Sequence, residues 1–335
     1  MNHDRPEKPP RGSVSAKHVA ELAGVSRTAV SRTFTPGASV APATRAKVLA
    51  AADALGYHVN HLARGLNRSE SGIVALIVAE LDTPFRSRFV ASLTNRLQAA
   101  GKVAMLINTD RSDESVEGAL RQAMSYRTDA AIVLSGRPDA ELGRLCERNG
   151  MRLVLINRDE DFPEALHVRL DDVRCGEDAF EHLRKRGCSR PALATSLHAT
   201  TSLRLRAKGF EAAARRAGVP ITVRSIGPTA YATGRDLGRA LLSSDDRPDG
   251  VFCTTDLLAC GFMDAARQEF GLRIPEDLSV IGFDDIHQAS WDSYRLTTFS
   301  QPIAEMCEAC VLWLGEASGG RSVSLKAELI PRETA

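Results

Sequence analysis

The sequence lacks the features that mark several classes of protein. It has no run of 18 apolar residues and no apolar segment near its start, so we expect neither a membrane span nor a secretory leader. It also lacks the motifs G-x-x-x-x-G-K-[ST], G-x-G-x-x-G, H-E-x-x-H and G-x-S-x-G. An enzyme interpretation therefore has no motif to support it, and we predict no catalytic residues, no cofactor and no metal site.

Cysteine is present, but its pattern argues against disulfides. The chain has seven cysteines, an odd number in a long sequence, which is typical of the reducing cytoplasm. Cys307 and Cys310 form a C-x-x-C pair within the apolar helical pattern of residues 303–314, and no second pair accompanies them. We interpret them as small core residues and expect a cytoplasmic protein without a membrane partner.

Length and charge indicate more than one domain. A chain of 335 residues exceeds one typical domain. Residues 1–70 carry 10 Lys and Arg against 5 Asp and Glu (net +5), and the remainder carries 33 against 37 (net −4), which together give +1. A basic N-terminal part favours a polyanion-binding domain joined to something else. Polar, proline-rich residues 1–12 are predicted to be a disordered tail.

Two short helices joined by a tight turn are predicted over residues 15–34. Ser15 can cap the first helix and Ser26 the second. Gly24, between them, tolerates the left-handed backbone conformation that ends a helix. The apolar positions of the first helix are Val19, Leu22 and Ala23, and the inward positions of the second are Ala29 and Val30.

The outward face of the second helix is polar and basic. Arg27 and Thr28 lie in its first turn, where side chains of a helix in the major groove reach base edges. Arg27 can donate two hydrogen bonds to a guanine, worth roughly 1–3 kcal/mol of discrimination. Ser31 and the helix ends capped by Ser15 and Ser26 are further candidates for DNA contact through phosphates, and Arg32 follows on the same face. The alternative is an ordinary helical hairpin with a solvated face.

A third helix is expected over residues 44–55, ended by Gly56. Together the three helices predict a small helix-turn-helix domain over residues 13–58. Its expected core consists of Val19, Val25, Val30, Val48, Leu49 and Leu55.

From Gly72 onward, short apolar runs alternate with amphipathic stretches. This alternation predicts an α/β fold with parallel sheets, in which ligands bind beyond the carboxyl ends of strands. The expected helices include residues 88–100, 115–126, 175–185, 203–216 and 233–243. The expected strands cover residues 73–78, 103–108, 130–134, 153–157, 191–195, 221–226, 251–254 and 278–283.

Several motifs are specific as an ordered set. They are VAELAGVSRTAVSR, TRAKVLAAADALGY and N-x-x-A-R-x-L, then TPF, DDVRCGEDAFEHLRKRGCSRPAL, RLRAKGF, CTTDLLACG, PEDLSVIGFDDI and LIPRET. With these motifs the chain resembles the LacI/GalR family of bacterial transcription regulators over nearly all of residues 13–334. The resemblance implies a helix-turn-helix head and a two-lobed core of the periplasmic-binding-protein type.

The resemblance also divides the rest of the chain. It implies a hinge helix or linker over residues 59–71, and a core over residues 72–335 that binds an effector and forms a dimer. The chain would cross three times between the lobes, one comprising residues 72–160 and 294–319 and the other residues 163–291 and 322–335.

Residues 60–66 correspond to the hinge helix of that family. A helix this short is marginal in water, but two copies from a dimer can stabilise each other in a minor groove. By the resemblance, Asn60 begins this helix, Ala63 permits close approach, Arg64 reaches phosphate and Leu66 is the apolar wedge that kinks the DNA. The alternative is a plain linker.

Effector contacts are implied by the same resemblance. Phe85, Arg86, Arg206 and Asp284 would line the cleft. An arginine–aspartate pair suits a polyhydroxyl ligand, because each charged group can hold two vicinal hydroxyls; a structural ion pair is the alternative. The resemblance implies as further neighbours in the site Asn157, Arg158, Arg204, Tyr231, Thr255, Asp256 and Trp291.

Arg86 stands where many members of the family carry a second aromatic residue. An additional cation near Arg206 indicates an anionic ligand, such as a sugar acid or a sugar phosphate, unless Arg86 points to solvent. The reason is that a buried cation without a partner is costly, and a ligand anion would supply that partner.

These observations predict a cytoplasmic, homodimeric transcription regulator, usually a repressor, that binds a pseudo-palindromic operator and responds to a small carbohydrate-like effector. Two rival functions are a sugar-binding protein without a regulatory role and an α/β enzyme acting on phosphosugars. The helix-turn-helix head argues against the first, and the lack of a nucleophile or phosphate loop against the second. Whether the effector induces or co-represses is left open.

Overall fold

The computed structural model describes residues 14–35, 37–58, 70–110, 112–134, 136, 139–158, 162–197, 200–316 and 319–335. The chain divides into two compact units, residues 1–71 and residues 72–335. In the part of the chain so described, no helix is both long and apolar enough to cross a membrane.

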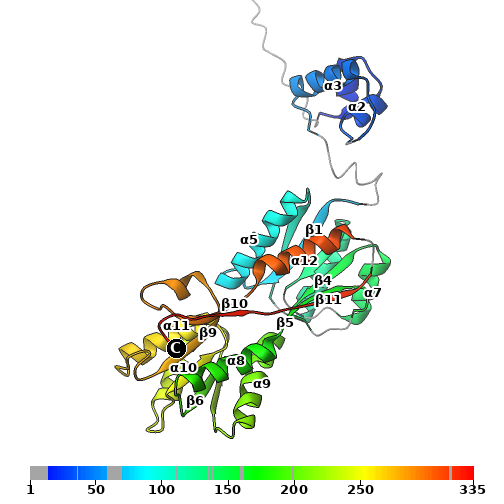
Figure 1. Cartoon of the computed structure of the whole chain (residues 1–335). Coiled ribbons are helices and arrows are strands. Elements are labelled where there is room, and N and C mark those ends of the chain that lie inside the picture. The colour runs from blue at the N-terminus through cyan, green and yellow to red at the C-terminus, as the bar shows by residue number, and fades with distance from the viewer. Residues whose placement is uncertain are drawn as a thin grey trace, which may run out of the picture. The chain divides into compact units, whose positions relative to one another are not determined.

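The N-terminal unit consists of three helices, α1 (Ala16–Ala23), α2 (Arg27–Thr33) and α3 (Pro42–Ala54), drawn in blue in Figure 1. Val19, Val30 and Val48 are buried at its centre. Leu49, which was predicted for this core, is instead on the surface with 47% of its area exposed, and Leu22, on the apolar face predicted for the first helix, is 57% exposed. A unit this small has too little interior to bury every apolar position.

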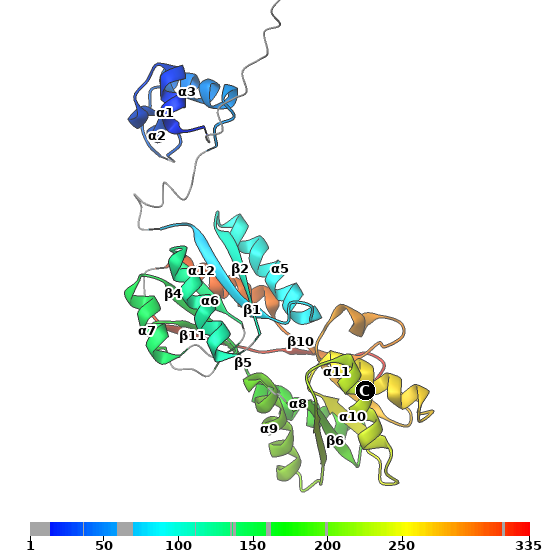
Figure 2. The ribbon, with the colours of Figure 1, turned by 180° about the vertical axis from the view of Figure 1, so that it is seen from behind.

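The second unit begins with a six-stranded, parallel sheet in the order β11-β5-β4-β3-β1-β2. Helices α5 and α12 lie on one face of this sheet (Figure 1), and α6 and α7 lie on the other (Figure 2). The strands are β1 (Ile73–Ala79), β2 (Val103–Thr109), β3 (Ala130–Val133), β4 (Arg152–Ile156), β5 (Leu166–Leu170) and β11 (Arg321–Leu325). The helices are α5 (Pro84–Ala99), α6 (Asp113–Ser125), α7 (Ala140–Arg148) and α12 (Ile303–Gly315).

A second six-stranded sheet has the order β12-β10-β9-β8-β6-β7, in which β12 alone runs antiparallel to its neighbour. Helices α8 and α9 pack on one face, and α10 and α11 on the other. The strands are β6 (Pro191–Ser196), β7 (Thr222–Ile226), β8 (Gly250–Cys253), β9 (Ser279–Asp284), β10 (Thr297–Ser300) and β12 (Glu328–Ile330). The helices are α8 (Asp172–Lys185), α9 (Thr201–Arg216), α10 (Tyr231–Leu242), α11 (Asp256–Gln268) and the 3-10 helix η1 (His287–Ser290).

The expected lobe boundaries need three corrections, because main-chain pairing assigns each strand to a sheet. Strand β5 pairs with β4, so residues 166–170 belong to the first lobe. Strand β10 pairs with β9, so residues 297–300 belong to the second lobe. Strand β11 pairs with β5, so residues 321–325 belong to the first lobe. The chain therefore crosses between the lobes after β5, after β10 and after β11.

One apolar core extends through both lobes. It joins the α5 and α12 face of the first sheet to the α8 and α9 face of the second. Within it a row of phenylalanines crosses the second lobe, with neighbouring ring centroids 5.4–6.4 Å apart. The row consists of Phe180, Phe210, Phe252, Phe299 and Phe283.

Helices α8 and α9 touch backbone to backbone. Gly176 on α8 faces the carbonyl oxygen of Arg206, and Gly209 on α9 faces that of Val173. A Cβ atom at position 176 would lie 2.0 Å from the Arg206 oxygen, and one at position 209 would lie 1.9 Å from the Val173 oxygen. The two glycines thus let the helices approach closely, and Arg206 sits at their crossing.

Candidate functional site

The turn between α1 and α2 has the local chemistry that its sequence predicts. Gly24 adopts φ = 65°, in the left-handed region, and ends α1. The Oγ of Ser26 accepts a hydrogen bond of 3.2 Å from the backbone N–H of Ala29 and caps α2. At the start of α1, the backbone N–H of Ser15 donates to Nδ1 of His18 at 3.2 Å.

Helix α2 presents one face to the core and one to solvent. Val30 and Thr33 are buried, whereas Arg27, Thr28, Ser31 and Arg32 are exposed. The exposed residues follow the spacing i, i+1, i+4, i+5 and so share one face of the helix. Four of the residues predicted to contact DNA are therefore displayed together. The predicted hinge residues Asn60, Ala63, Arg64 and Leu66 lie outside the described residues.

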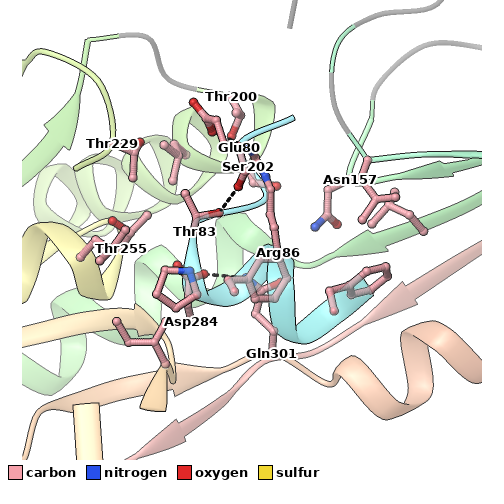
Figure 3. A pocket seen from close by; sticks show the side chains of 18 of the residues that line it. Glu80, Thr83, Arg86, Asn157, Thr200, Ser202, Thr229, Thr255, Asp284 and Gln301 are labelled. Atoms are coloured by element: carbon pink, nitrogen blue, oxygen red, sulfur yellow. Dashed lines mark hydrogen bonds and ion pairs between the residues drawn. The ribbon is translucent and has the colours of Figure 1, made fainter. Parts of the chain in front are cut away.

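A cavity of about 120 Å³ lies between the two lobes of the second unit. Its walls come largely from residues that follow the carboxyl ends of β1, β3, β4, β6, β8 and β9, where parallel sheets bind ligands. Figure 3 shows Thr229 and Thr255 on one side, Asn157 on the other, and Arg86 between them. Seven of the predicted effector residues line this cavity: Phe85, Arg86, Asn157, Arg158, Arg206, Thr255 and Asp284.

Arg206 is the fixed cation of the cavity. Its side chain is 3% exposed, and its guanidinium stacks 3.4 Å from the ring centroid of Phe283. Nε donates to Oδ1 of Asp172 at 2.8 Å, and Nη1 donates to the carbonyl oxygen of Thr254 at 2.9 Å. These partners hold the guanidinium rigidly, so Asp172 supplies the ion pair and the contact to Asp284 is the longer one, 3.9 Å.

Asp284 completes a cluster in which carboxylates outnumber the cation. One of its oxygens accepts a hydrogen bond of 2.7 Å from Nε2 of Gln301. Burial raises the pKa of Asp284 to about 6, although Arg206 opposes that shift. Burial also raises the pKa of Asp172. The cluster can thus accept hydrogen bonds from ligand hydroxyls, and its charge depends on pH.

Arg86 lines the cavity, but its charge already has a partner. Nη1 forms an ion pair with Glu80 and donates to the carbonyl oxygen of Ala79 at 2.8 Å. The side chain is 16% exposed, so it does not extend into solvent. The expected need for a ligand anion as that partner does not arise, because the chain itself supplies Glu80.

Two further predicted residues lie in the wall with their polar groups engaged by backbone. Nη2 of Arg158 donates to the carbonyl oxygen of Leu134 at 2.5 Å. Oδ1 of Asn157, a residue with φ = 54°, accepts from the N–H of Leu170 at 3.1 Å. These bonds fix the loop after β4 against the adjoining strands, so both residues shape the cavity.

Four residues predicted for the effector site lie outside the cavity wall. Arg204 is exposed and donates to Oγ1 of Thr201. Tyr231 donates to Asp264 at 2.6 Å on the surface of α10 and α11. Trp291 is 46% exposed and donates to His287. Asp256 is fully buried behind the wall, where it accepts hydrogen bonds from the Thr298 hydroxyl and the Ile286 N–H.

Comparison with known proteins finds a matching family for each of the two units. Residues 15–60 match the family model "Bacterial regulatory proteins, lacI family", and residues 180–335 match "Periplasmic binding protein-like domain". The Ribose operon repressor of Escherichia coli (strain K12) is 31% identical over 298 residues, covering 88% of this chain and 90% of that protein. The chain belongs to the lacI family.

Solved structures extend the likeness to the whole lacI-family fold. The lac repressor dimer bound to operator and the anti-inducer ONPF superposes with a TM-score of 0.86 at 25% identity, covering 96% of this chain and 99% of that one. The transcriptional regulator CelR–cellobiose complex gives 0.69 at 28%, covering 96% and 100%. The curated relatives of this lacI-family chain are transcription regulators, not enzymes.

The structure of this lacI-family chain also reveals wall residues that the sequence did not point to. Glu80 follows β1, and Gln301 follows β10, a strand that the sequence pattern did not predict. Thr200, Ser202 and Thr229 bring hydroxyl groups from the second lobe. The rule that ligands bind beyond the carboxyl ends of strands could have identified Glu80 and Thr200, since both follow predicted strands.

Proposed function

We propose that this chain is a dimeric repressor that binds a pseudo-palindromic operator through α2 and is controlled by a small polyhydroxylated effector in the cavity between its lobes. The observation that carries the proposal is the capped helix α2, which displays Arg27, Thr28, Ser31 and Arg32 on one face. The similar lac repressor structure, a dimer bound to its operator, supports the dimeric form. Repression of genes also places the protein in the cytoplasm.

The cavity favours a neutral sugar. Its wall holds three cations, Arg86, Arg158 and Arg206. The carboxylates that accompany them are Glu80 and Asp284 in the wall and Asp172 behind Arg206, so the charges of the site balance. Hydroxyls on the second lobe can exchange hydrogen bonds with a sugar, and Phe85 offers an apolar surface for its ring. Two relatives agree in kind, one named for the ribose operon and one solved with cellobiose. A sugar acid or sugar phosphate is the second candidate, since cations outnumber anions in the wall itself.

DNA recognition is tested by selecting operator sequences from random DNA with the purified protein and then comparing variants. Arg27→Ala should lose roughly 1–3 kcal/mol on the selected operator and much less on random DNA, because Arg27 reads a base. Arg121→Ala on α6 removes the same charge from the other unit and should change neither affinity. Equal losses on both DNAs would show that Arg27 contacts only phosphate.

Effector recognition is tested by the shift in thermal unfolding on adding neutral sugars, sugar acids, sugar phosphates or nucleosides. A ligand that binds only the folded state stabilises it by RT ln(1 + [L]/Kd), so binders appear as a raised melting temperature. We expect neutral sugars to give the largest shift. A larger shift with an anionic derivative than with its neutral parent would contradict this choice.

A further inference from the structure

The C-terminal end of α2 is tied down by side chains and backbone. The last four carbonyl groups of any α-helix lack partners within the helix, and something else must satisfy them. Here each has one. The carbonyl oxygen of Val30 accepts from the N–H of Phe34 at 3.4 Å, and that of Arg32 accepts from the N–H of Thr35 at 3.0 Å. The carbonyl oxygen of Ser31 accepts from the hydroxyl of Thr35 at 2.8 Å. The carbonyl oxygen of Thr33 accepts from Nη1 of Arg45 at 2.9 Å.

The bond from Arg45 differs from the other three because it comes from another helix. Arg45 is half-buried on α3, and its Nη1 reaches the last residue of α2, Thr33. Its Nη2 donates to the carbonyl oxygen of Ala38, in the segment between the two helices, at 3.4 Å. One guanidinium therefore joins α3, the end of α2 and the connecting loop. Its positive charge also suits the negative end of a helix dipole.

Helix α2 has few other anchors for its size. It has seven residues and buries only Val30 and Thr33. The turn at Gly24 fixes its beginning, while its end depends on Arg45 and on the contact of Phe34 with Tyr57, whose ring centroids are 5.7 Å apart. A short helix held at both ends has a defined tilt, whereas one held at a single end can swing.

We propose that Arg45 is a positioning residue for DNA recognition, which sets the tilt of α2 so that Arg27 and Thr28 meet base edges. The proposal rests on the proposed function of α2. Arg45 acts through two backbone carbonyls and contacts no base. Losing it should therefore reduce sequence-specific binding while leaving the general attraction of a basic surface for DNA.

The test uses the full chain with Arg45→Met, which keeps length and removes the donors, and Arg45→Lys, which keeps the charge with one donor group. Lys47→Met, two residues along α3 and exposed, is the matched control. Affinity is measured on the selected operator and on random DNA across a salt series. We expect Arg45→Met to weaken operator binding tenfold or more and random-DNA binding less than twofold, with the salt slope unchanged. Arg45→Lys should fall between Arg45→Met and wild type, and Lys47→Met should keep the ratio of the two affinities.

Other results would overturn the proposal. Similar losses on both DNAs with a salt slope smaller by about one would show that Arg45 contacts a phosphate directly. Loss of binding to both DNAs together with loss of helical circular dichroism would show that Arg45 only holds the fold. Unchanged operator binding would show that α2 needs no tether. If wild type itself selects no operator, the proposed function fails first, and this inference fails with it.

Discussion

The crossing of α8 and α9 allows a sharp test of how Arg206 is held. In Gly176→Ala the new methyl carbon would lie 2.0 Å from the Arg206 carbonyl oxygen and 2.8 Å from the Phe210 nitrogen, and both atoms belong to backbone. Real Cβ contacts essentially never fall below 3.0 Å, so the helices must separate by at least about 1 Å (3.0 − 2.0). Such a shift would break the 2.8 Å bond from Arg206 to Asp172.

The expected magnitude combines two opposing effects. Overpacking of this kind costs about 1–3 kcal/mol, and replacing glycine by alanine within a helix returns up to about 1 kcal/mol. We therefore expect Gly176→Ala to lower the free energy of unfolding by about 1–2 kcal/mol. For a unit of this size each kcal/mol corresponds to about 2–4 °C, so the melting temperature should fall by several degrees. The affinity for a sugar that raises the melting temperature of the wild type should fall as well, because Arg206 moves.

Gly118→Ala is the matched control. Gly118 lies exposed on α6, and a Cβ atom there would meet no atom within 4 Å. The same substitution should therefore raise the free energy of unfolding by about 0.5–1 kcal/mol. Both variants are compared by urea and thermal unfolding. A Gly176→Ala protein that is stabilised as much as Gly118→Ala would refute the close backbone contact.

Three further predictions follow from buried charges and from the resemblance. Burial raises the pKa of Asp284 to about 6 and that of Asp256 to about 7, above the unfolded value near 4, so the folded chain holds these protons more tightly. The stabilisation from these groups is therefore full below about pH 4 and is lost as the pH rises to about 7.5. When urea midpoints are measured across this pH range, Asp256→Asn should make the decrease in stability with pH less steep. A double-mutant cycle of Glu80→Gln and Arg86→Met should give a coupling free energy of about 1–2 kcal/mol in unfolding, and additive effects would contradict the pair. Leu66→Ala should reduce the operator bend seen in a circular-permutation gel assay without altering sugar binding; an unchanged bend would exclude the wedge role.

The helix-turn-helix could be predicted from the sequence because its determinants are local. Gly24 and Ser26 specify the turn and the cap by their own backbone chemistry. The exposure of Leu22 and Leu49 could not be predicted in this way, since helical periodicity marks an apolar face and does not tell whether a neighbour covers it.

In the core, long buried strands such as β1 were predictable, and the exchange of strands between lobes was not. Strand β5, with the sequence LHVRL, and the edge strand β11, with RSVSL, are short and carry polar residues. Their sheet assignment depends on pairing with distant segments, which no local pattern records. The family resemblance placed Tyr231 and Trp291 near the effector site, but their side chains bond to Asp264 and His287 on the surface. The partner of Arg86 was missed because Glu80 lies in an irregular turn with φ = 52°.

The shared apolar core has a consequence for cooperativity. Two lobes with separate sheets could melt in two steps, each at its own temperature. Here side chains of both sheets pack into one continuous interior, including the phenylalanine row that ends beneath Arg206. Unfolding either lobe would expose the apolar surface of the other, so the two lobes should unfold together in one cooperative transition. A sugar that binds at the cavity therefore protects the whole unit, including helices that it never touches.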